Sequence, residues 1–129
     1  MNWHLVTYAD ENFVEQQKYL HQIHKEGFVH HPFNRKQLES TKFYKEHKKI
    51  LDQDKGAGWW LWKPYYILEV LKKSKTNDFI IYSDCGDMFS YGLKPYIETT
   101  LNDNDISLLL LGNAKNGHMT KRDCFIKMN

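Results

Sequence analysis

One short segment constrains the fold of this chain more than any other: the apolar run Phe79 to Tyr82, followed directly by Ser83 and Asp84. Four strand-forming residues without a polar interruption are typical of a strand that helices cover on both faces, as in a mostly parallel sheet. In such sheets ligands bind outside the carboxyl ends of the strands. The run therefore predicts a buried central strand that delivers Asp84 to the rim of the sheet, within reach of a ligand.

Strand and helix patterns alternate along the rest of the chain. The predicted strands are Trp3 to Tyr8, Phe28 to His31, Phe79 to Tyr82 and Ile106 to Leu111. The predicted helices run from residues 9–12 to Gly27, from Arg35 to Gln53, from Lys63-Pro64 to near Lys75, from Lys94 to Asn102 and from Thr120 to Met128. This alternation predicts an α/β fold with a Rossmann-like, mostly parallel sheet flanked by helices.

Size and composition favour one soluble domain. A chain of 129 residues with 41% hydrophobic content can bury one core, so we expect a single domain over residues 1–129. A formal net charge of only +2 gives no reason to expect a nucleic-acid partner. The longest apolar runs fall far short of the ~20 residues that a membrane span needs, and Cys85 and Cys124 fit no ligand spacing. We therefore expect a cytoplasmic protein with reduced thiols and no membrane span.

The strongest cluster of potential ligands is Asp84 and Asp87 with Gly86 between them. A hard divalent cation prefers oxygen ligands, and a diphosphate needs a cation to neutralise its charge. Two carboxylates at a strand end, with a glycine that permits close approach of the backbone, suit a metal-diphosphate site. The same residues also suit an ordinary acidic turn, in which Asp84 caps the next element and Gly86 adopts a positive φ. Spacing alone does not decide between the two.

A second candidate is Gly56 to Pro64, where glycines, three tryptophans and Lys63 precede a helix. Helix N-termini attract phosphate, and the ammonium of Lys63 would add a positive charge. Because a cation in the first helical turn opposes the helix dipole, Lys63 needs another reason to be there. The tryptophans also suit a hydrophobic core, which we expect for Trp60, and the glycines also suit the end of a helix.

The stretch Gly56 to Asp87 resembles a group of glycosyltransferases whose pattern is a glycine pair, an aromatic-Trp-Lys-Pro helix start, and a strand that ends in Tyr-x-Asp-x-Gly. That group is similar to nucleotide-sugar transferases of the A-type fold, which have a Rossmann-like sheet and an Asp-x-Asp metal motif. Val6 to Asp10 is similar to the first strand of such enzymes, and Thr120 to Asp123 to a later stretch of the group. The resemblance implies the nucleotide-binding half of an A-type transferase.

The resemblance also implies roles for matching positions. Asp84 matches the first aspartate of the metal motif, and Gly86 stands where many A-type enzymes have the second, which leaves Asp87 as the other candidate ligand for Mn²⁺ or Mg²⁺. Asp84 and Asp87 are also the candidate catalytic residues. The residues expected to contact the nucleotide sugar, the first three of them around its base, are Tyr8, Ala9, Asp10, Trp59, Lys63, Ser83 and Gly86.

The implied reaction is transfer of a sugar from a nucleoside diphosphate, with uridine diphosphate (UDP) favoured, to a hydroxyl acceptor. A metal or cationic group would stabilise the charge that builds on the leaving diphosphate, and Asp87 and Asp123 are candidate general bases. Two alternatives stay open. One is a binding module for a nucleotide or nucleotide sugar without transfer activity, and the other is a structural domain that completes its fold against another chain. A homo-oligomer would supply acceptor-binding surface from a second subunit.

The histidines form no metal motif. His21 and His24 lie at i, i+3, and His30 and His31 are adjacent, yet none falls into H-E-x-x-H or a Cys/His zinc spacing. We therefore expect them to be exposed polar side chains.

Overall fold

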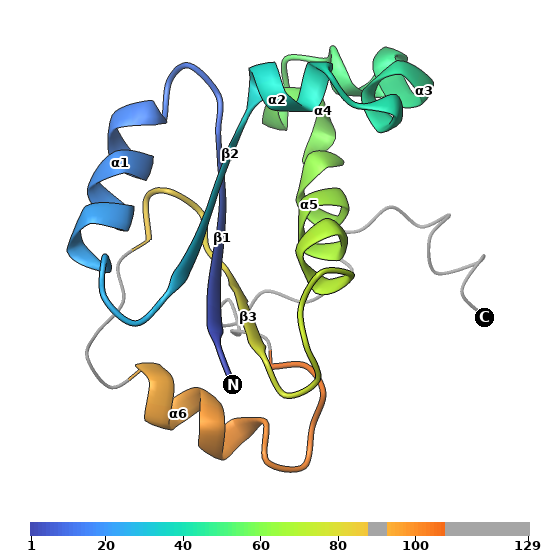
Figure 1. Ribbon diagram of the computed structural model, residues 1–129. Coiled ribbons are helices and arrows are strands. Elements are labelled where there is room, and N and C mark those ends of the chain that lie inside the picture. Colours follow the sequence, from blue (N-terminus) through green and yellow to red (C-terminus); the bar gives the residue numbers. More distant parts are fainter. Residues whose placement is uncertain (88–92, 108–129) are drawn as a thin grey trace, which may run out of the picture. The chain divides into compact units, whose positions relative to one another are not determined.

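The computed structural model describes residues 1–87 and 93–107 of the chain (Figure 1). The chain divides into two compact units, Met1–Met88 and Phe89–Asn129. Every residue predicted to contact a donor or a metal lies in the first unit. The prediction of one nucleotide-sugar-binding domain over residues 1–129 stays a prediction.

The first unit is built on a parallel sheet of three strands, β1 (Trp3–Ala9), β2 (Val29–Asn34) and β3 (Phe79–Tyr82), in the order β2-β1-β3. All of β1 is buried, whereas β3 is half-buried. Within the described residues β1 is the central strand and β3 pairs with β1 alone, so the expectation of a central strand at 79–82 is not confirmed there. Polar His4 and Thr7 interrupt the apolar pattern of β1, and their side chains form hydrogen bonds inside the fold.

Helices cover both faces of this sheet (Figure 1). α1 (Val14–Ile23) joins β1 to β2, and α5 (Trp62–Leu71) precedes β3 on the opposite face. Successive right-handed crossovers that run in opposite directions across a sheet pass over opposite faces. The two connections diverge between β1 and β3, which is where open α/β sheets bind ligands. The prediction of a mixed α/β fold with a parallel sheet flanked by helices is confirmed.

β2 runs through Pro32, although the sequence predicts that this strand ends before the proline. Pro32 pairs with Thr7 of β1 in the ladder. A proline has no N–H to donate, so it is tolerated in an edge strand and not in a central one. In the described part of the chain β2 is such an edge, because it pairs there with β1 alone.

The single helix predicted from Arg35 to Gln53 is wrong, because the segment forms two helices, α2 (Arg35–Glu39) and α3 (Lys42–Leu51). The break has a local cause. The hydroxyl of Thr41 donates to a carbonyl oxygen of α2 at 2.7 Å and accepts from the backbone N–H of Tyr44 at 3.0 Å. A threonine that binds nearby backbone groups in this way caps a helix rather than continuing one.

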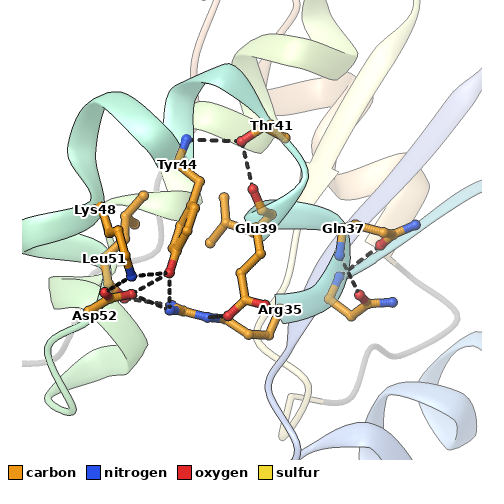
Figure 2. Close-up of polar contacts among 10 residues, drawn as sticks. Arg35, Gln37, Glu39, Thr41, Tyr44, Lys48, Leu51 and Asp52 are labelled. Carbon is orange, nitrogen blue, oxygen red and sulfur yellow. Dashed lines mark hydrogen bonds and ion pairs between the residues drawn. The ribbon is translucent and has the colours of Figure 1, made fainter.

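Arg35 ties α2 to the end of α3 (Figure 2). Its guanidinium donates to the carbonyl oxygen of Leu51 at 2.5 Å and to the carboxylate of Asp52 at 2.7 Å. Lys48 and Tyr44 also donate to Asp52, and these two hydrogen bonds lower the pKa of its carboxyl to about 2. This charged segment is therefore more than the solvated face that its composition suggests, since the network fixes the carbonyl of Leu51.

The main hydrophobic core packs around one face of α5. Its buried members are Val6, Tyr8, Leu38, Tyr44, Leu51, Trp62, Tyr66 and Val70. The three from α5 follow each other at intervals of four residues, which places them on one side of the helix. Aromatic rings provide much of the contact: the centroids of Tyr8 and Trp62 lie 4.0 Å apart, and those of Phe33 and Tyr66 lie 3.9 Å apart.

The second unit contains α6 (Leu93–Thr100), which agrees with the helix predicted from Lys94 to Asn102. Ile106 is exposed and not in a strand, contrary to the strand predicted to begin there, and residues 108–111 of that strand lie outside the described residues. The helix predicted over residues 120–128 and the candidate base Asp123 lie outside them as well. None of the described helices is long and apolar enough to cross a membrane.

The histidines around α1 and β2 contact one another instead of facing solvent. His21 lies 2.7 Å from the hydroxyl of Thr7, and its Nδ1 atom lies 2.6 Å from Nδ1 of His30. Burial, together with the smaller effects of the nearby His30 and His31, lowers the pKa of His21 to about 4. Burial also lowers the pKa of His24 and of His31. The expectation of exposed side chains is wrong here because α1 packs this face onto β1 and β2.

These histidines predict a loss of stability in mild acid. The unfolded chain binds a proton at His21 below about pH 6.5, whereas the folded chain does so only below about pH 4, so the free energy of unfolding falls as the pH falls through this window. We expect a loss of about 1–2 kcal/mol between pH 7 and pH 5, after allowance for partial exposure. Urea denaturation at both pH values measures it. His21→Gln should reduce the loss and His47→Gln, at an exposed position of α3, should not. Equal stability of the wild type at both pH values would contradict the prediction.

Candidate functional site

The carboxyl ends of β1 and β3 lie side by side, and the chain after β3 continues along β1. The backbone N–H of Ser83 donates to the carbonyl oxygen of Val6 at 3.1 Å, and the thiol of Cys85 donates to that of Tyr8 at 3.1 Å. Burial, together with the smaller effect of the nearby Asp84, raises the pKa of Cys85 to about 11, so this thiol stays protonated at neutral pH. These contacts hold residues 83–87 against the rim of the sheet.

Residues 84–87 form a turn in which the N–H of Asp87 donates to the carbonyl oxygen of Asp84 at 3.0 Å. Ser83 is buried, and its hydroxyl donates to the same carbonyl at 3.0 Å. Asp84, Gly86 and Asp87 are exposed. Gly86 does not have a positive φ, and an added Cβ would meet nothing within 4 Å. The acidic turn is therefore present, but its backbone does not require glycine.

The carboxylate of Asp84 contacts the ammonium of Lys63 and the phenol of Tyr82. Nζ of Lys63 lies 3.1 Å from its Oδ1 atom, and the hydroxyl of Tyr82 donates to the same oxygen at 2.5 Å. The ammonium also lies 4.7 Å from the centre of the Tyr82 ring. The side chain of Asp84 is 60% exposed and that of Lys63 is 30% exposed, so both groups are open to a ligand. The structure thus brings together two predicted site residues from different elements.

Sequence reasoning missed Tyr82 as a member of this cluster. Its hydroxyl lies in the strand two residues before Asp84, and alternate residues of an extended chain point to the same side. This spacing could have identified it. Burial and the hydrogen bond to Asp84 both raise the pKa of Tyr82, so the phenol is a donor and not an acceptor here.

A left-handed turn precedes Lys63. Within it, α4 (Gly56–Trp59) is a single turn, and all residues from 56 to 60 have positive φ, namely Gly56, Ala57, Gly58, Trp59 and Trp60. This conformation costs about 1–2 kcal/mol for each non-glycine residue, so the surroundings must hold it in place. The backbone N–H of Trp60 and the indole N–H of Trp62 both donate to the carbonyl oxygen of Gly56 at 3.0 Å.

The turn decides which tryptophan is buried. Trp62 enters the core, whereas Trp59 and Trp60 are each 47% exposed. The expectation that Trp60 packs in the core is therefore wrong, because the left-handed backbone turns its side chain outward. The ammonium of Lys55 lies 4.8 Å from the ring centre of Trp59. Contact of Trp59 with a nucleotide sugar stays a prediction.

The three residues predicted to surround a base lie at the end of β1. Tyr8 and Ala9 are buried and Asp10 is partly exposed. Burial raises the pKa of Tyr8 to about 12, and its hydroxyl has no hydrogen-bond partner among the described residues. The carboxylate of Asp10 accepts from the N–H of Asn12 at 2.9 Å. Of the three side chains, only that of Asp10 is open to a ligand from this rim.

The donor set at this rim does not fit a divalent cation held by the protein alone. No group of three His, Cys, Asp or Glu that could hold a metal occurs among residues 1–87 and 93–107. The predicted ligand Asp84 already contacts the ammonium of Lys63, a charge that repels a second cation. Because a bound diphosphate would bring oxygen ligands of its own, Mn²⁺ or Mg²⁺ at Asp84 and Asp87 stays a prediction.

The chain matches no protein-family model, no curated protein and no solved structure. Its function must therefore be inferred from the chemistry of the site and not from its relatives.

Proposed function

We propose that this chain is a glycosyltransferase whose donor is a nucleoside diphosphate sugar, with a UDP-sugar favoured, and that its first unit is a Rossmann-like nucleotide-binding half. The observation that supports this most is the contact of Lys63 with Asp84 beside the carboxyl ends of β1 and β3. That rim is where parallel α/β sheets bind nucleotides. A partly exposed ammonium there is suited to a diphosphate, since phosphate oxygens form strong hydrogen bonds with charged donors.

In the proposed transfer, the bond between the anomeric carbon and the β-phosphate oxygen breaks, and its electron pair leaves with the diphosphate. A hydroxyl oxygen of the acceptor forms the new bond to the anomeric carbon, and the hydroxyl proton passes to a base. Asp87 is exposed at the end of the same turn as Asp84 and is our candidate for that base. Positive charge beside the diphosphate favours the transition state because negative charge builds there as the bond breaks.

A binding module for a nucleotide or nucleotide sugar is the second candidate. It is favoured by the pairing of Asp84 with Lys63 and by the absence, among the described residues, of three His, Cys, Asp or Glu side chains that could hold a metal. A module of this kind would bind the diphosphate in the same place without transferring the sugar.

The proposal predicts both binding and cleavage. UDP should stabilise the protein by about 2.7 kcal/mol at 100 times its Kd, because a ligand that binds only the native state stabilises that state. At the same concentration, guanosine diphosphate (GDP) should raise the melting temperature less than UDP does. The protein should also release UDP slowly from a UDP-sugar, with water as the acceptor. Asp87→Asn should lower that rate by about 10²-fold or more and leave UDP binding unchanged, as expected for loss of a general base. Thermal shift and UDP release, each with and without Mn²⁺, measure these effects.

Asp103→Asn is the matched control, because Asp103 is an exposed aspartate of the second unit. Its rate and UDP binding should equal those of the wild type. Binding without cleavage of any UDP-sugar or GDP-sugar would favour the binding module. If neither nucleotide shifts the melting temperature under either condition, the proposed function is refuted.

A further inference from the structure

We propose that Lys63, and not a divalent cation, supplies the positive charge that binds the donor's diphosphate, and that this diphosphate takes the place of Asp84 at the ammonium. This inference rests on the proposed function and specifies which group neutralises the negative charge of the diphosphate. It follows from the contacts of Lys63 and Asp84 in the first unit.

Lys63 occupies a helix position that does not favour a positive charge. It lies in the first turn of α5, where the helix dipole disfavours a cation, so something outside the helix must favour its presence. Two such features are present: the carboxylate of Asp84 at 3.1 Å and the ring of Tyr82 at 4.7 Å. Both lie at the end of β3, so the ammonium is directed over the rim of the sheet instead of along its own helix.

The ammonium of Lys63 already provides a cation at this rim. An ammonium next to a carboxylate gives the pair no net charge, so Asp84 retains little attraction for Mn²⁺ or Mg²⁺. The turn offers a second carboxylate in Asp87, but the described residues include no third His, Cys, Asp or Glu that could complete a metal site with these two. Lys63 therefore provides, beside Asp84, the positive charge that a metal would otherwise have to supply to the diphosphate.

Asp84 can release Lys63 without being left unpaired. Its Oδ1 atom also accepts from the hydroxyl of Tyr82 at 2.5 Å, and its side chain is 60% exposed to water. A diphosphate carries more negative charge than one carboxylate and therefore attracts an ammonium more strongly. The donor should therefore displace Asp84 from Lys63, while Tyr82 and water keep the freed carboxylate solvated.

Lysine and metal mechanisms predict opposite effects of one substitution, Asp84→Asn. If the carboxylate competes with the diphosphate for Lys63, its removal should tighten UDP binding, on the order of threefold for an exposed ion pair. If the carboxylate holds a metal, the same substitution should weaken UDP binding in the presence of Mn²⁺. Isothermal titration with UDP and with GDP, in EDTA and then in Mn²⁺, measures the direction.

Substitutions of the lysine complete the experiment. The affinity of the wild type for UDP should be the same, within about threefold, in EDTA and in Mn²⁺. Lys63→Gln should lower this affinity by about tenfold or more, whereas Lys63→Arg should retain most of it. Lys72→Gln is the matched control, because Lys72 forms a surface ion pair with Glu69 at the other end of α5. Should Lys63→Gln fail to fold by circular dichroism, the sign of the Asp84→Asn effect still decides.

UDP binding that requires Mn²⁺ and weakens in Asp84→Asn would overturn the inference and leave the proposed function standing. Unchanged affinity in a folded Lys63→Gln variant would overturn it as well. If the wild type binds neither UDP nor GDP in either buffer, both the inference and the proposed function are refuted.

Discussion

Gly58→Ala should destabilise the fold by about 4 kcal/mol or more, which corresponds to a fall in Tm of about 15 °C or more. Two independent effects add. Gly58 has a φ of +102°, which a residue with a side chain adopts only under strain of about 1–3 kcal/mol. In addition, a Cβ at this position would lie 2.6 Å from Cα and 2.8 Å from the carbonyl oxygen of Leu51. These are backbone atoms, and Arg35 holds that carbonyl, so little can move to make room.

The effect matters for the site because Gly58 lies in the turn that leads to Lys63. Thermal unfolding followed by circular dichroism measures the loss. Gly86→Ala is the matched control: a Cβ there meets nothing within 4 Å and the residue lacks a positive φ, so the change should be within about 0.5 kcal/mol. Equal melting temperatures for Gly58→Ala and the wild type would show that the backbone can leave the left-handed conformation at no cost.

The second large effect is expected for Trp62→Ala, at about 3–5 kcal/mol. Trp62 is buried, its ring stacks on that of Tyr8 at 4.0 Å, and its indole N–H donates to the carbonyl oxygen of Gly56 at 3.0 Å. The substitution therefore opens a cavity beside β1 and also removes a hydrogen bond that closes the left-handed turn. Urea denaturation measures the change in the free energy of unfolding.

Two further variants separate the causes of that loss. Trp62→Phe keeps an aromatic ring against Tyr8 but lacks the N–H, so it should cost about 1–2 kcal/mol. Trp60→Phe should cost less than about 1 kcal/mol, because Trp60 is 47% exposed. A larger loss for Trp60→Phe than for Trp62→Ala would mean that the burial of these two side chains is reversed in solution.

Several elements of the fold could be predicted because their signals are local. The strand at Phe79–Tyr82, the helix that begins near Lys63-Pro64 and the end of α1 before Gly27 all follow from residue preferences over a few positions. Two of the errors have tertiary causes. Pro32 is tolerated because its strand lies at the edge of the sheet, and His21 is packed because α1 lies on β1 and β2.

The candidate site was predicted in part for the same reason. Asp84 and Lys63 were identified from their places at a strand end and at a helix start, which are local features. Their contact was not predicted, because Lys63 lies at the start of α5 and Asp84 follows β3, so the rest of α5 and all of β3 separate the two residues in sequence. The hydrogen bond from Tyr82 to Asp84 was missed, although strand alternation would have suggested it.

The sequence by itself determined that this chain alternates strands and helices and that acidic residues follow the strand at 79–82, because periodicity and turn chemistry act over neighbouring residues. Only the tertiary structure decided that β1 is the central strand, that a left-handed turn exposes Trp60 and buries Trp62, and that Lys63 pairs with Asp84. These outcomes depend on which elements pack together. Pairing between strands and contacts across the core join residues far apart in the chain, and no local pattern specifies them.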